Sequence, residues 1–196
     1  SLSSVTLCEG LTSIGSNAFS KCYHLTGIAI PSTVTSISSS AFSGCAFYSD
    51  QFINNSHCED ADNWGALIIS HGEEIDGMVI KDHMLIYARR YLTSAKIPEG
   101  VTSIGEDAFK DCILLDSVSI PNTVTLIAAF AFYDCSKLSS VTLSDSLTSI
   151  GRSAFYNCSS LDSISIPGKV TSIGYSAFRN CTSLSSVTLP DSLTSI

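Results

Sequence analysis

The chain repeats itself every 23 residues, and this period constrains its fold more than any other feature of the sequence. The repeated pattern is L-x-x-[IV]-x-[IL]-P-x-x-[VL]-T-x-I-G-x-x-A-F-x-x-C. A unit of this size with one apolar side cannot bury that side alone, so the copies are predicted to stack into a solenoid. Five copies carry most of the pattern, a sixth has Cys8 in the proline position and a seventh stops at Ile196; they begin at Leu2, Leu25, Leu92, Leu115, Leu138, Leu161 and Leu184.

Each part of the pattern predicts a local structure. Leu161, Ile164 and Ile166 place apolar side chains on one face of an extended segment, which predicts a strand. The proline that follows cannot donate a ladder hydrogen bond, so it ends the strand and turns the chain. The glycine of V-T-S-I-G, such as Gly151, is expected to take a φ that other residues resist. The A-F-x-x-C segment is expected to form a short helical turn.

Phenylalanine and cysteine each recur at one position in six copies, so stacking would align them as two ladders inside the solenoid. Parallel Cβ vectors make a disulfide between neighbouring cysteines difficult, and these thiols are predicted to be free and buried. Cys8 and Cys58 lie off the ladder, and their bonding state stays open. The ladder residues are Phe19, Phe42, Phe109, Phe132, Phe155 and Phe178, with Cys22, Cys45, Cys112, Cys135, Cys158 and Cys181.

The joint occurrence of I-P, V-T-S-I-G and A-F-x-x-C at one phase resembles the leucine-rich repeat family. It is most similar to the BspA-like subclass, which occurs in surface proteins of host-associated bacteria and some protists. The resemblance implies a curved, right-handed, β-rich coil with a parallel sheet on the concave face and short strands and helical turns on the convex side. It also implies a cell-surface or extracellular location, and adhesion or ligand binding rather than catalysis.

Residues 48–91 do not fit the pattern and are predicted to form an irregular insertion between two copies in 1–47 and four copies plus a truncated one in 92–196. A hairpin is predicted over 78–87, with Asp82 and His83 at its tip. One interpretation is a degenerate pair of repeats that continues the core of a single solenoid domain. The other is a recognition element set on a plain scaffold. We also expect the chain to be a fragment of a longer array, which could associate end to end through uncapped repeats.

The composition excludes several classes of function. Hydrophobic residues make up 44% of the chain, enough for a sizeable core, whereas charged residues make up only 14%. The net charge of -8 opposes binding to nucleic acid and to anionic membranes. No apolar run approaches the roughly 20 residues that a membrane span needs, so no transmembrane segment is predicted.

No metal site, cofactor or catalytic site is predicted. There is no C-x-x-C pair and no histidine pair four residues apart, so the common zinc spacings are missing. Asp60 and Asp62 begin a segment like a calcium loop, but Trp64 and His71 stand where oxygen ligands are required. The many serines lack a recurrent histidine partner, so nucleophilic catalysis is not expected.

The exposed strand face is predicted to be small, neutral and hydroxylated, and therefore to bind through area or multivalency. A threonine ladder that includes Thr102 and Thr148 is assigned mainly to structure, with ligand contact as the alternative. The candidate ligand contacts are Trp64, His71, His83, Tyr87, Arg89 and Arg90 in and beside the insertion, and Lys96, Ser119, Thr142 and Ser165 on the strand face.

Three classes of function follow, in decreasing order of support. The first is a surface binding or adhesion module whose partner is a protein or a glycan. The second is a structural spacer that projects other domains and has no ligand of its own. The third is an enzyme with a site in the insertion, which no residue spacing supports.

Overall fold

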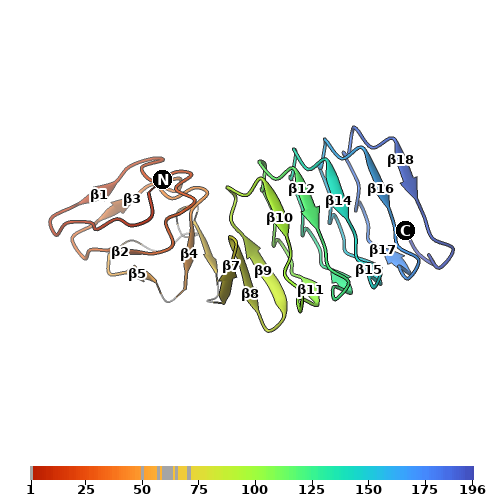
Figure 1. Cartoon of the computed structure of the whole chain (residues 1–196). Helices are drawn as coiled ribbons and strands as arrows, with labels where there is room; N and C mark the ends of the chain where they lie inside the picture. Colours follow the sequence, from red (N-terminus) through yellow and green to blue (C-terminus); the bar gives the residue numbers. More distant parts are fainter. Residues whose placement is uncertain (1, 50, 57, 59–63, 65, 70–71) are drawn as a thin grey trace. The chain divides into compact units, whose positions relative to one another are not determined.

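A computed structural model describes residues 2–49, 51–56, 58, 64, 66–69 and 72–196. The chain divides into two compact units, Ser1–His71 and Gly72–Ile196. The boundary falls inside the segment that departs from the repeat, and each unit is considered by itself. Both are built from short, mostly parallel strands (Figure 1), and the described residues contain no α-helix.

In the second unit, successive coils stack in register to form β-sheets along two sides (Figure 1). Strand partners are 23 residues apart, as in the pairing of Ser117 with Ser140, which confirms the parallel stacking that the repeat predicts. One side consists of β10 (Ser94–Lys96), β12 (Ser117–Ser119), β14 (Ser140–Thr142), β16 (Ser163–Ser165) and β18 (Ser186–Thr188). The other is a seven-stranded sheet of β7 (Glu73–Ile75), β8 (Met78–Lys81), β9 (Met84–Ala88), β11 (Ser103–Ile104), β13 (Leu126–Ile127), β15 (Ser149–Ile150) and β17 (Ser172–Ile173).

The irregular segment contributes strands to both units. In the second unit, β8 pairs antiparallel with β9, and Asp82 and His83 between them have φ values of 51° and 62°, the left-handed conformation of a two-residue hairpin turn. β9 also pairs parallel with β11. Among the described residues of the first unit, the strand pairings are parallel: β1 (Ser13–Ile14) with β3 (Ser36–Ile37), β2 (Ile28–Ile30) with β5 (Phe52–Asn54), and β4 (Ala46–Tyr48) with β6 (Leu67–Ile69).

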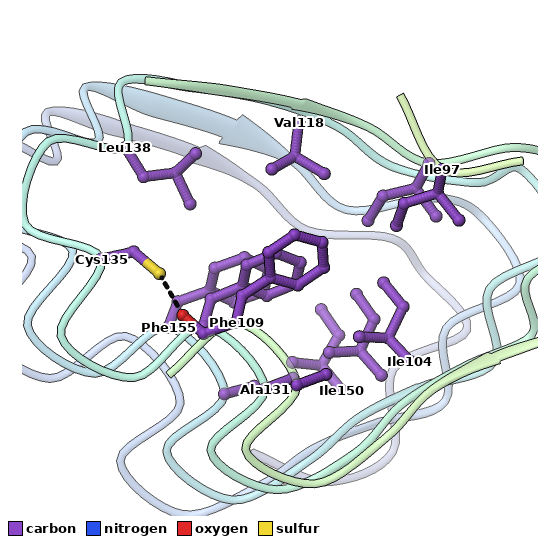
Figure 2. Packing of buried hydrophobic residues seen from close by; sticks show 14 of the residues in the cluster. Ile97, Ile104, Phe109, Val118, Ala131, Cys135, Leu138, Ile150 and Phe155 are labelled. Carbon is purple, nitrogen blue, oxygen red and sulfur yellow. Dashed lines mark hydrogen bonds between the residues drawn. The ribbon is translucent and has the colours of Figure 1, made fainter. Parts of the chain in front are cut away.

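The predicted phenylalanine ladder forms the centre of the core in the second unit (Figure 2). The ring centroids of Phe109 and Phe132 lie 4.8 Å apart, those of Phe132 and Phe155 5.0 Å, and those of Phe155 and Phe178 5.4 Å. The planes of these pairs differ by at most 12°. Each ring therefore packs against its equivalent in the next coil, as in-register stacking requires.

The A-F-x-x-C segments form β-turns, and the helical turns expected from the sequence are not formed. The Cys112 N–H donates to the Phe109 carbonyl, three residues back. The Phe109 and Asp111 N–H groups instead donate to the carbonyls of Ala131 and Tyr133 in the next coil. Because alternate amides bond between coils, they are not available for the i to i−4 bonds of an α-helix.

At Gly151, close backbone packing favours the glycine of V-T-S-I-G, and the special φ expected there is wrong. Gly151 has an ordinary φ, but a Cβ on it would lie 2.5 Å from the carbonyl carbon of Ala128 in the preceding coil. Left-handed φ values occur instead at Ser153 (51°) and Asn157 (62°), within the following turns. Gly151 is therefore there to let two coils approach closely.

The cysteine ladder is free, as predicted, and it also supplies hydrogen-bond donors to the interior. The Cys135 Sγ donates to the Phe109 carbonyl at 3.1 Å (Figure 2), and Cys158 Sγ donates to the Phe132 carbonyl at 3.2 Å. Burial raises the pKa of the Cys112 thiol to about 12. Cysteine thus fills a small apolar space and satisfies a buried carbonyl that the turn leaves with spare acceptor capacity.

Candidate binding surface

The exposed side of strands β10, β12, β14, β16 and β18 is the leading candidate surface, and it is called the sheet surface below. Strand register places Lys96 beside Ser119, Ser119 beside Thr142, and Ser165 beside Thr188. All five side chains are exposed, because they alternate with core residues such as those of the 117–120 segment. The four sequence-predicted contacts on this face therefore lie on one continuous side of the second unit.

A groove of about 580 Å³ crosses the sheet surface over β14, β16 and β18. β14 and β16 belong to adjacent coils but to separate sheets, so strand pairing is interrupted beneath the groove. The lining is mainly hydroxyl-bearing, with one carboxylate, and consists of Ser139, Ser140, Val141, Asp162, Ser163, Ile164, Ser165, Ser186 and Thr188.

One edge of this groove alternates aspartate and serine from coil to coil. The Ser139 Oγ donates to the Asp116 Oδ1 at 2.8 Å, and the Ser163 Oγ donates to the Asp162 Oδ1 at 3.1 Å. These bonds hold two carboxylates in place while leaving each with further acceptor capacity. The surface can therefore accept and donate hydrogen bonds, but it offers no aromatic anchor for a tight single contact.

Sequence reasoning did not single out Asp116, Ser139 or Asp162. The sequence does contain an indication of them, because the position after the first leucine of each copy alternates between aspartate and serine. In successive coils it is Asp116, Ser139, Asp162 and Ser185. Aligning the copies position by position shows this alternation, but the interrupted pairing beside it becomes visible only in the structure.

The threonine ladder has the structural role that was favoured from sequence. Thr148 Oγ1 donates to the Thr125 carbonyl at 2.9 Å, and Thr194 Oγ1 donates to the Thr171 carbonyl at 2.9 Å. The acceptor lies in the preceding coil, so each hydroxyl adds a bond between coils. These hydroxyls supplement the backbone ladder.

Three predicted contacts in the irregular segment are buried, and this corrects their assignment as surface contacts. Trp64, Tyr87 and Arg89 have exposed fractions of 3%, 3% and 1%. Trp64 packs against Phe42 at a centroid distance of 6.5 Å, and Arg89 forms a bidentate ion pair with Glu74, with Nη2 2.9 Å from Oε2. Trp64 belongs to the core of the first unit, whereas Tyr87 and Arg89 are buried outside the main core cluster of the second unit, with the Arg89 guanidinium 5.5 Å from the Tyr87 ring centroid.

The other predicted contacts of the irregular segment differ in exposure. His83 is exposed at the hairpin turn, and its Nδ1 lies 3.2 Å from the Gly100 carbonyl oxygen. Arg90 is half-buried and pairs with Asp111 at 3.6 Å. His71 lies outside the described residues. His83 and Arg90 thus remain available in part, at positions separate from the groove.

Metal binding and membrane insertion gain no support from the parts of the chain that the structure describes. No group of three or more potential metal ligands occurs among those residues. The calcium-like segment that begins at Asp60 lies outside them. Likewise, the described residues contain no helix long and apolar enough to cross a bilayer.

Comparison with known proteins gives the same architecture. A leucine rich cell surface protein of Faecalibacterium prausnitzii is 29% identical with a TM-score of 0.64, over 96% of this chain and 54% of that chain. A leucine-rich repeat protein of Bacteroides ovatus is 30% identical with a TM-score of 0.55, over 93% and 42%. The leucine rich repeat protein of T. pallidum is 29% identical with a TM-score of 0.59, over 64% of each chain.

This chain thus spans less than two thirds of the length of each of these three proteins. No curated protein matches it. Residues 1–63 and 80–196 match the BspA type leucine rich repeat region in six copies. With the repeat, the stacked parallel coils and this match in agreement, the chain belongs to the BspA-type leucine-rich repeat family.

Proposed function

We propose that this chain is a non-catalytic binding module of a cell-surface or extracellular protein, and that its sheet surface contacts a protein or glycan ligand. The observation that carries the proposal is the groove over β14, β16 and β18, with its hydroxyl lining and the Asp162 carboxylate. Membership of the family and the likeness to a leucine rich cell surface protein support the location. A surface of small side chains suits low affinity per contact, repeated over several coils.

The repeat supplies little for catalysis within the described residues. Cys45 and Cys181 of the ladder are held as neutral thiols, because burial raises the pKa of each to about 11. A thiol is a weak nucleophile unless its pKa is lowered. Binding is therefore the function that the side chains of the sheet surface serve best.

The proposal is tested by placing charge and bulk along the sheet surface. The triple variant Ser119→Lys, Thr142→Lys and Ser165→Lys is compatible with the fold, because Lys96 occupies the same ladder position in the first of these coils. Purified wild type and variant are applied to arrays of extracellular-matrix glycoproteins and of the glycans released from them. We expect the triple variant to reduce binding by at least tenfold.

The matched control is Ser183→Lys, which lies on a turn outside the sheet surface. Lysine already occupies the equivalent position two coils earlier, at Lys137, so this variant adds one lysine without structural cost, and it is compared with each single lysine variant of the sheet surface as well as with the triple variant. It is expected to bind like wild type. Undiminished binding by the triple variant would contradict the proposal, and a wild type that binds nothing on either array would favour the spacer function.

A further inference from the structure

A second hollow, of about 410 Å³, lies on the turn segments of the second unit, and we call it the turn-face hollow. It is lined by Glu106, Asp107 and Lys110 from one coil and by Phe130 and Tyr133 from the next. The turn segments are a different part of each coil from the strands of the sheet surface. The inference below therefore goes beyond the proposed function and does not depend on it.

Phe130 departs from the repeat in a way that the core does not explain. It has a φ of 56°, and its equivalents in neighbouring coils, Asp107 (57°), Ser153 (51°) and Ser176 (57°), are small or polar. A bulky aromatic residue rarely adopts left-handed φ, which costs free energy unless the surroundings impose it. The Phe130 ring is not part of the core cluster and is only half-buried. Strain of this kind is typical of functional sites.

The two rings of the hollow form a corner. The Phe130 and Tyr133 centroids lie 5.8 Å apart with their planes at 67°. Tyr133 is held from the next coil by Tyr156, which stacks on it at 4.8 Å with planes 5° apart. Arg152 lies over Phe130 at 5.5 Å, from the coil on the opposite side to Asp107 and Lys110. The aromatic corner is therefore fixed before any ligand arrives, which lowers the entropy cost of binding.

The lining of the hollow carries two acids, Glu106 and Asp107, and one base, Lys110. Lys110 Nζ lies 3.2 Å from the Asp107 Oδ1 and 5.8 Å from the Tyr133 centroid. Lys110 already fills the space in which an external cation would meet both an acid and a ring. A cationic ligand would have to displace it. The rim presents hydrogen-bond donors and acceptors together.

We propose that the turn-face hollow binds a pyranose residue of a glycan. A sugar ring has an apolar C–H face that can pack in the corner of Phe130 and Tyr133, and a perimeter of hydroxyls that both donate and accept hydrogen bonds. Glu106 and Asp107 accept from these hydroxyls, and Lys110 donates to them. An apolar floor with a few placed polar groups, in a hollow of this size, is typical of small-ligand sites.

The test uses saturation-transfer difference NMR on the whole chain with a panel of methyl α-mannoside, methyl β-galactoside, methyl β-glucoside and N-acetylglucosamine. We expect ring C–H protons of at least one sugar to receive saturation. The variant Phe130→Ser is expected to weaken its binding at least tenfold. Serine occupies the equivalent positions 153 and 176 with the same left-handed φ, so Phe130→Ser retains the fold, and thermal melting verifies this.

Two further variants sharpen the result. Tyr175→Ser removes an aromatic ring that is 72% exposed and lies outside the hollow, and it is expected to bind like wild type. Asp107→Asn keeps a residue that adopts the same φ at Asn17, and it is expected to weaken binding several-fold through the loss of charged acceptors.

The proposal is overturned if no sugar of the panel receives saturation, or if Phe130→Ser binds as wild type does. It is also overturned if tetramethylammonium, used as a cationic probe, binds the hollow more tightly than every sugar. Because none of these variants touches the sheet surface, failure here leaves the array experiment on that surface unaffected.

Discussion

The regular coils of residues 92–183 and the irregular segment that follows Phe42 use the same backbone bond but pack their rings differently. The Phe109 N–H donates to Ala131, and the Phe42 N–H donates to Trp64 at 3.0 Å, at the same spacing along the chain. Yet Phe109 and Phe132 stack within 12° of parallel, whereas Phe42 and Trp64 meet at 58°. The hydrogen-bond ladder thus persists where the pattern is lost, whereas the stacking of equivalent rings in successive coils does not. Phe47 and Phe52, which are not equivalent positions, stack on each other instead, at 5.5 Å with planes 13° apart.

This difference separates two requirements of a solenoid. Backbone ladders need only that neighbouring coils lie in register, because every non-proline residue carries a donor and an acceptor. Ordered ladders of side chains need identical residues at identical positions. Trp64 fills the core beside Phe42 and Phe52 by its volume alone, in the position that the pattern gives to alanine.

The largest effect is expected from a substitution that interrupts the phenylalanine ladder of the regular coils. Phe132→Ala removes a ring that stacks on both Phe109 and Phe155, and it should lower the free energy of unfolding by about 3 to 5 kcal/mol. In the first unit, Phe52→Ala should cost only about 1 to 2 kcal/mol, because Phe52 is half-buried and stacks on one ring only, that of Phe47 at 5.5 Å. Urea unfolding followed by circular dichroism measures both variants, and Trp64 fluorescence reports the first unit separately.

Equal losses in the two variants would contradict the expectation that a buried ring stacked on both sides stabilises the fold more than a half-buried ring.

The next effect concerns how closely regular coils approach. Gly151→Ala places a Cβ 2.5 Å from the Ala128 carbonyl carbon, so the coils must separate, and we expect a loss of about 1 to 3 kcal/mol in the free energy of unfolding. Gly168→Ala is the matched control, because a Cβ there meets nothing within 4 Å, and it should change stability by less than about 0.5 kcal/mol. If Gly151→Ala left the free energy of unfolding unchanged, the explanation that this glycine allows two coils to approach closely would be refuted.

A third effect is a dependence on alkaline pH that differs between the units. Burial raises the pKa of Cys112 from 9.0 to about 12 and that of Cys45 from 9.0 to about 11. Above pH 9 the unfolded chain loses these protons while the folded chain keeps them. Each thiol therefore contributes stability that is complete below about pH 9 and is lost as pH rises toward its folded pKa.

The slope amounts to at most about 1.4 kcal/mol per pH unit for each thiol. Unfolding free energies measured from pH 8 to 11.5 should fall less steeply in Cys112→Ala than in wild type. Cys45→Ala should flatten the curve over a narrower range that ends near pH 11. Parallel curves for wild type and Cys112→Ala would argue against a buried neutral thiol.

The smallest effect is expected from the threonine ladder. Thr148→Val removes one hydroxyl that donates to the Thr125 carbonyl at 2.9 Å, and it should cost about 0.5 to 1 kcal/mol, since the site is exposed. Thr35→Val removes a longer bond of 3.2 Å to Thr12 in the first unit and should cost less. Thermal melting of the two variants ranks them, and a larger loss at Thr35 would reverse the predicted order.

Much of the fold could be predicted from sequence, because each copy has the same pattern of apolar and turn-forming residues. The positions of Phe132, Cys135 and Thr148 in the ladders follow from the period of 23 residues alone. The predictions of helical turns and of an unusual glycine φ were wrong for one shared reason. Both were judged within a single copy, whereas the amides of the turns and the space around Gly151 are decided by the neighbouring coil.

The site was predicted in part. Lys96, Ser119, Thr142 and Ser165 lie on the sheet surface as the strand period indicated, since alternation along a strand fixes which side chains point outward. Trp64, Tyr87 and Arg89 were assigned to ligand contact because they lie in the segment that departs from the repeat. A departure from the repeat does not distinguish a surface anchor from a side chain that is buried inside the fold.

The sequence by itself determined the stacking, the register and the composition of the core, because a fixed period leaves one way to align equivalent residues. Only the tertiary structure decided which contacts form where equivalent positions in neighbouring coils differ. It separated β14 from β16 beneath the groove, buried Arg89 against Glu74, and brought Phe130 beside Asp107 and Lys110. The physical reason is that these features arise between coils, from packing and hydrogen bonds that no single copy encodes.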